Sequence, residues 1–149
     1  MRILIASVAI LAATTSLAHQ GATGIVKERM DHMKSIKAAM KVLGPIFKGQ
    51  VPYDADAVRG AARTLSAKGG TAMTDLFPEG TTQHPSEALP AIWQDWQAFS
   101  NSARELEVSA ALLFETAGNA RDGGASDPMK AFARVVGTCR GCHEDFRKD

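Results

Sequence analysis

The residues best suited to chemistry lie together near the end of the chain, in a C-x-x-C-H sequence formed by Cys139, Cys142 and His143. Two thiols three residues apart share one face of a helix and can add to the two vinyl groups of one porphyrin. His143 lies four residues after Cys139 on the same face, and imidazole is a good ligand for haem iron. The spacing therefore predicts one haem c, attached covalently through Cys139 and Cys142, with His143 bound to the metal.

Three other uses of this motif receive less support. A redox-active C-x-x-C pair normally accompanies a βαβ pattern, which the sequence lacks. A structural zinc site needs a fourth ligand and usually a second paired motif. A disulfide between Cys139 and Cys142 would close a very short loop and add little stability.

The beginning of the chain has the pattern of an export signal. Arg2 supplies a positive start, residues 3–13 are largely apolar, and Ser16-Leu17-Ala18 has small residues at the positions that signal peptidase reads. We therefore expect residues 1–18 to be a signal peptide and residues 19–149 to form one domain in the periplasm. The apolar run is too short to span a bilayer comfortably, and no second long apolar stretch follows, so stable membrane insertion is not expected. An uncleaved anchor or a buried first helix is the alternative.

Composition excludes several classes of protein. The 149 residues include 17 Lys+Arg and 16 Asp+Glu, so no basic excess points to a nucleic-acid partner. A 45% hydrophobic content and 22% charged content rule out wholesale disorder, and two cysteines are too few for a disulfide scaffold. A 6% aromatic content also favours helices over a β-sandwich.

Four stretches have apolar residues at helical spacing, which predicts an all-α, antiparallel four-helix bundle. The first runs from Ile25 to about Lys48 and is bent or ended by Gly44-Pro45. Asp54 should cap the second, which Gly69-Gly70 interrupts. The third begins near residues 86–90 and ends around Gly118. Asp127-Pro128 opens the fourth, whose expected inner face consists of Phe132, Val135, Val136, Cys139, His143 and Phe146.

The chain resembles the class II c-type cytochromes, the cytochrome c′ family, in which C-x-x-C-H lies on the last helix rather than near the N-terminus. Residues 48–54 resemble the family's connection between its first two helices. Pro90-Ala91-Ile92-Trp93, with Phe99 further on, resembles the start of its third helix, and His143 followed by Arg147 resembles its closing turn. The likeness covers nearly all of residues 25–149 and implies a four-helix bundle carrying haem c.

The resemblance leaves open the sixth position of the iron. In cytochromes c′ an apolar residue, often leucine, follows an arginine by four positions, and the iron is five-coordinate; a low-spin branch has methionine there. In this sequence the arginine is Arg29 and the fourth residue on is Met33, which implies His/Met ligation. Met33 could instead fill the core, because methionine packs adaptably. Met30 and His32 are rival ligands, and His32 is expected to be solvated.

Two arginines and a tryptophan complete the expected site. The resemblance places Arg29 near the haem propionates and Arg147 near the proximal ligand, and arginine pairs well with carboxylates. Either arginine could instead be an ordinary surface residue. Trp93 matches the family tryptophan and is expected at the haem wall, whereas Trp96 departs from the family pattern.

The expected function is that of a one-electron carrier, which meets redox partner proteins in transient complexes and needs no catalytic acid, base or nucleophile. We therefore do not expect an enzyme. The alternative is a five-coordinate cytochrome c′ that binds nitric oxide or carbon monoxide. Some family members are homodimers and others monomers, and the sequence does not decide between them.

Overall fold

The computed structural model describes residues 21–122 and 126–148, so the expected signal peptide lies outside the described residues. The part of the chain that it describes is helical, with a single isolated β-bridge between Ala88 and Arg147. The elements are α1 (Gly24–Phe47), α2 (Ala55–Ala67), α3 (Gly70–Thr74), α4 (Ala91–Gln94), α5 (Trp96–Thr116), the 3₁₀ helix η1 (Ala117–Asp122) and α6 (Ser126–Phe146).

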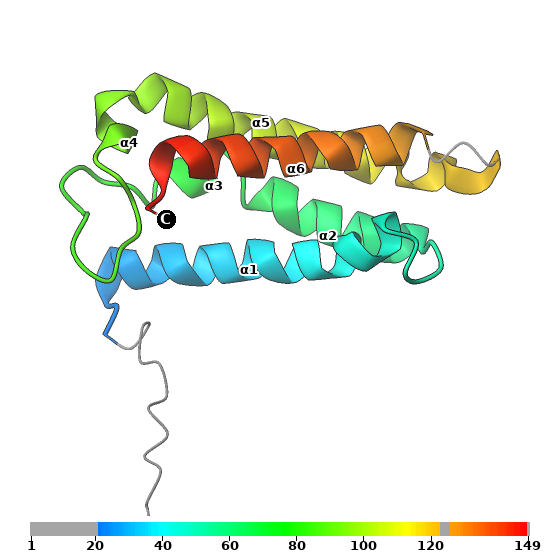
Figure 1. The fold of residues 1–149 in the computed structure, drawn as a ribbon, viewed down its shortest axis with the longest axis horizontal. Helices are drawn as coiled ribbons and strands as arrows, with labels where there is room; N and C mark the ends of the chain where they lie inside the picture. The colour runs from blue at the N-terminus through cyan, green and yellow to red at the C-terminus, as the bar shows by residue number, and fades with distance from the viewer. Residues whose placement is uncertain (1–20, 123–125, 149) are drawn as a thin grey trace, which may run out of the picture.

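The four long helices form the predicted antiparallel bundle, with α1, α2, α5 and α6 alternating in direction (Figure 1). Helix α1 packs on α2, and both α2 and α6 pack on α5. Helices α1 and α6 make few direct contacts and face each other across the open end of the bundle. None of the described helices combines the length and apolarity that a membrane crossing requires.

The helix ends follow local sequence signals. The carboxylate of Asp54 accepts hydrogen bonds from the backbone N–H groups of Asp56 and Ala57, as predicted for the cap of α2. The prediction of one continuous third helix is wrong at Asp95. This residue ends α4, and its side chain accepts a hydrogen bond from the Ala98 N–H, so it caps α5. Gly44-Pro45 does not end α1, which continues to Phe47.

The core follows the apolar stripes of the four helices. Its largest fully buried side chains include Leu43, Leu65, Leu113 and Val135, one from each long helix. Val136 was expected on the inner face of α6 but is 41% exposed. Successive residues on a helix lie about 100° apart, so burial of Val135 turns Val136 towards solvent.

A glycine pair brings α3 close to α5. A Cβ atom at Gly69 would lie 2.5 Å from the backbone nitrogen of Glu107, and Gly70 has a φ of +55°. A residue with a side chain would collide with α5 at the first position and rarely adopts the positive φ of the second. The pair therefore lets the chain turn sharply after α2 and leads it to Phe77, which lines the site.

Candidate haem-binding site

A cavity of about 390 Å³ lies between α1 and α6, and the segment before α4 closes one side of it. Its volume falls within the range of roughly 300–1,000 Å³ that is common for small-molecule and cofactor sites. The lining is mainly apolar with several charged side chains. The residues are Val26, Arg29, Met30, Met33, Lys34 and Lys37 from α1; Phe77, Pro85, Ser86, Glu87 and Ala88 from the connection; and Ile92, Phe99, Cys142, His143, Phe146 and Arg147.

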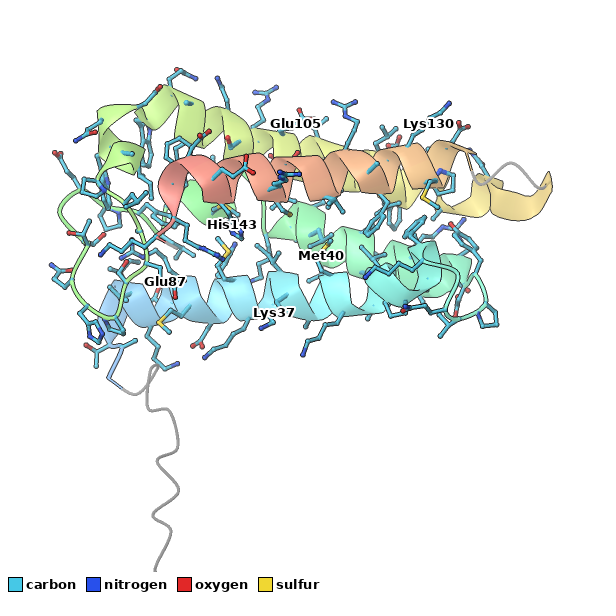
Figure 2. The ribbon with its side chains drawn as sticks, in the orientation of Figure 1. Lys37, Met40, Glu87, Glu105, Lys130 and His143 are labelled. Atoms are coloured by element: carbon cyan, nitrogen blue, oxygen red, sulfur yellow. The ribbon has the colours of Figure 1, made fainter. Side chains whose placement is uncertain are left out.

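Helix α6 contributes the predicted attachment motif. Cys142 and His143 line the cavity, and Figure 2 shows His143 in the region between α6 and α1. Cys139 is half-buried and packs against the core next to the cavity. No disulfide joins the two cysteines. Burial raises the pKa of Cys139 and, with a smaller contribution from nearby negative charge, raises the pKa of Cys142 to about 11.

The surroundings of His143 favour the neutral imidazole, which is the form that binds metals. Burial lowers its pKa, and the positive charge of Arg147 lowers it further, against an opposing effect of Glu87. A lower pKa favours the neutral ring, which has a free nitrogen lone pair for a metal. The backbone N–H of Arg147 donates to the His143 carbonyl at 3.2 Å, and the Ala88–Arg147 bridge ties this last turn to the segment before α4.

Helix α1 forms the opposite wall and contributes the predicted thioether. Met33 is half-buried, packs against the core and lines the cavity with His143. The structure thus brings two residues that are 110 positions apart in the sequence to the same cavity. Met30 also lines it, whereas Met40 packs on the core without reaching it.

Arg29 is the most unusual residue of the site, because its side chain is only 5% exposed although it is charged. Its Nη2 donates to the Thr81 carbonyl oxygen at 2.5 Å, and its Cζ lies 4.7 Å from the centre of the Phe77 ring. Its Nε and Nη1 have no hydrogen-bond partner among the described residues, and burial lowers the pKa of the group. Buried polar atoms almost always have partners, so these two donors fit a ligand that brings acidic oxygens into the cavity.

His32 corrects an expectation, because it is buried rather than solvated. Its side chain is 7% exposed, and its Nε2 donates to the Lys68 carbonyl oxygen at 2.7 Å. The contact arises because the end of α2 packs against α1, which nearby sequence could not show. Burial lowers the pKa of His32, and the residue does not line the cavity.

Trp93 packs against the core and is not among the residues that line the cavity. Its indole Nε1 donates to the Phe77 carbonyl oxygen at 2.9 Å, and its side chain packs against the core. It lines a second, more open depression instead of the cavity. Trp93 therefore supports the cavity through Phe77. Phe77 and Thr81 were missed as site residues, and Thr81 acts through its backbone carbonyl, which carries no sequence signal.

The donor set suits a covalently attached haem. Two thiols and an imidazole lie on one helix, a thioether faces them, and an unsatisfied guanidinium is available for propionate oxygens. Fold and site together define a c-type haem protein built on a four-helix bundle. The chain belongs to the cytochrome c′ family, because the family model described as Cytochrome C' matches residues 24–147.

Individual relatives agree with this assignment. The chain is 35% identical over 130 residues to cytochrome c-556 of Agrobacterium tumefaciens (strain II Chrys), covering 83% of this chain and 97% of that protein. The structure of cytochrome c prime from Shewanella frigidimarina matches with a TM-score of 0.74 at 27% identity, over 84% of this chain and 94% of that one. The nitric oxide complex of a leucine-to-alanine variant of cytochrome c prime from Alcaligenes xylosoxidans matches with a TM-score of 0.71 at 26% identity, over 84% and 94%.

Membership of this family implies a covalently bound haem c, for which the chain supplies the cysteines at 139 and 142. The protein is therefore a c-type cytochrome, and its function lies in electron transport or gas binding.

Proposed function

We propose that the protein is a periplasmic one-electron carrier whose haem iron is bound by His143 on one side and Met33 on the other. The observation that carries this proposal is the position of the two side chains, which line one cavity from α6 and α1. Haem supplies a one-electron couple when bound. A methionine ligand favours the ferrous state and raises the reduction potential relative to two histidines.

The other residues position and shield the group. Cys139 and Cys142 hold it covalently, Arg29 offers Nε and Nη1 to a propionate, and Arg147 lies beside the His143 ligand. The phenyl rings that line the cavity would help to exclude water from a bound haem. No side chain is required as an acid, base or nucleophile, so the protein need not be an enzyme.

Gas binding is the second candidate, and one specific similarity favours it. A protein with a closely similar fold has been solved as a nitric oxide complex. For this chain the same activity requires Met33 to pack away from the iron and leave the sixth position open.

The oxidised absorption spectrum of the mature holoprotein at neutral pH separates the two functions. We expect low-spin ferric bands with a weak methionine-to-iron charge-transfer band, and slow binding of carbon monoxide to the ferrous form. A high-spin ferric spectrum with rapid carbon monoxide binding would refute Met33 ligation and establish the gas-binding alternative.

We also propose that residues 1–18 direct export and are removed. The mass of the protein purified from the periplasm should then equal that of residues 19–149 plus one haem. A periplasmic protein that retains residue 1, or that has the mass of the bare polypeptide, would contradict the cleavage or the attachment respectively.

A further inference from the structure

The second depression, which we call the Trp96 depression, lies on the other side of Phe77 from the haem cavity. It has a volume of about 440 Å³, and its lining includes Asp75, Phe77, Glu79, Trp93 and Trp96. Phe77 also lines the haem cavity, so one side chain is shared by both. The function proposed above does not use Trp96, Asp75 or Glu79.

Trp96 gives this depression an exposed apolar surface. Its side chain is 41% exposed although tryptophan is the largest apolar residue, and it is the first residue of α5. Tryptophan is enriched among the residues that contribute most to binding energy at protein interfaces. An indole left partly in water beside a depression is therefore a good anchor for a partner.

The Trp96 depression carries two acidic side chains, and the one cation that the structure places against its Phe77 wall is the buried Arg29. Asp75 and Glu79 are both exposed, and neither forms an ion pair with any described residue. Between Lys68 and Arg104 the sequence contains four acidic residues and no lysine or arginine. Complementary charge steers association and selects partners, so this surface favours cationic side chains over acidic ones.

A chain of aromatic rings connects the depression to the cavity. The ring of Trp96 lies 5.6 Å from that of Phe99, which lies 4.8 Å from Phe77 and 5.5 Å from Phe146. The three phenylalanines all line the haem cavity. A partner seated on Trp96 would thus be separated from the haem by packed side chains and not by water.

We propose that the Trp96 depression is the docking site for a redox partner protein that presents lysine or arginine side chains around its own redox centre. This proposal rests on the electron-carrier function proposed above and names the class of partner. One electron passes between the two redox centres, so the partner is oxidised as the haem iron is reduced, or the reverse.

The first test uses a lysine octapeptide as the probe and ¹⁵N-labelled ferrous holoprotein at low ionic strength. We expect chemical-shift changes at the backbone amides of residues 74–77 and Glu79 and at the Trp96 indole N–H, and none with a glutamate octapeptide. Glu79→Gln should weaken binding about two- to five-fold, as is typical for loss of one exposed charge pair. Glu115→Gln is the matched control, because it also removes one exposed carboxylate. Glu115 lies near the end of α5, roughly 28 Å along the helix from Trp96.

The second test measures electron transfer with small reagents of opposite charge. Ferrous holoprotein is oxidised by cationic tris(phenanthroline)cobalt(III) or by anionic ferricyanide, each of which takes one electron. Glu79→Gln and Trp96→Ala should slow the cobalt reaction about two- to five-fold and leave the ferricyanide reaction unslowed, while both variants retain the wild-type absorption spectrum.

Peptide shifts centred elsewhere, or equal effects of Glu79→Gln and Glu115→Gln, would overturn the docking site. Sedimentation that shows a dimer dissociated by Trp96→Ala would also overturn it, because the occupant would then be a second copy of this chain. These results are distinct from failure of the proposed function. A high-spin ferric spectrum refutes the carrier function regardless of peptide binding, whereas a low-spin spectrum without shifts at the depression refutes only the docking site.

Discussion

Replacing Arg29 with leucine tests whether its buried guanidinium has an acidic partner when haem is attached. The side chain is 5% exposed, and two of its three nitrogens have no hydrogen-bond partner among the described residues. We expect Arg29→Leu to destabilise the ferric holoprotein by about 3–5 kcal/mol, since each lost hydrogen bond to a charged group contributes about 1.5–3 kcal/mol.

The size of the change in unfolding free energy depends on whether the guanidinium has an acidic partner. Without an acidic partner, leucine would lose the Thr81 hydrogen bond and the Phe77 contact, together about 3 kcal/mol. It would also relieve the cost of burying an unpaired charge, which is on the order of several kcal/mol. These two effects nearly cancel, so the variant would be about as stable as the wild type. Only a carboxylate on Nε and Nη1 produces a large loss.

Urea unfolding of the holoprotein, followed by circular dichroism, measures this difference. With a urea dependence of about 1.5 kcal/mol per molar, a loss of 3 kcal/mol lowers the midpoint by about 2 M. Arg63→Leu is the matched control, because Arg63 also lies over an aromatic ring, that of Phe114 at 5.1 Å, but is exposed and outside the cavity. The control should lose less than about 1 kcal/mol. Equal midpoints for Arg29→Leu and the wild type would refute the propionate role of Arg29.

The remaining predictions concern the iron ligand and two glycines. Met33→Ala should give a high-spin ferric haem that binds carbon monoxide in the ferrous form, whereas Met40→Ala should keep the wild-type absorption spectrum; an unchanged spectrum in Met33→Ala would exclude this ligand. Gly69→Ala should lower the free energy of unfolding by about 1–3 kcal/mol, because its Cβ would collide with the Glu107 backbone, and wild-type stability would contradict the close packing. Gly60 lies inside α2, and a Cβ atom added there would have no neighbour within 4 Å. Gly60→Ala should therefore raise the free energy of unfolding by about 0.5–1 kcal/mol in the same urea assay, and any loss would contradict its exposed position.

The sequence was informative wherever the signal was local. The helical stripes, the Asp54 cap and the C-x-x-C-H spacing depend on residues within a turn or two of one another. The structure has the cap where it was predicted and, apart from the break at Asp95, the four long helices as well. Met33 and His143, which the resemblance to the family implies as iron ligands, line the same cavity, and their bonds to iron stay predictions.

The errors came from contacts between distant segments. Burial of His32 depends on the carbonyl of Lys68, which lies 36 residues later. The hydrogen bond of Arg29 to the carbonyl of Thr81, 52 residues later, was likewise not predicted, although the expected role of Arg29 is not contradicted. Any residue type offers the same carbonyl group, so composition and periodicity cannot locate such acceptors. The hydrogen bond of Trp93 to the Phe77 backbone could not be predicted for the same reason, and a position of Trp93 beside the haem stays a prediction.

The arrangement of the helices has a consequence for how the cofactor and the fold depend on each other. Among the described residues α2 is the main helical neighbour of α1. Helix α6 meets α1 through the stacked rings of Phe47 and Phe132, 4.3 Å apart, whereas further along the two helices the cavity lies between them. Haem attached to α6 therefore acts as the second packing surface for α1. Slow hydrogen exchange along α1 should therefore depend on whether the iron is bonded to this helix. Loss of that bond should lower the local unfolding free energy of the side of the bundle that α1 forms.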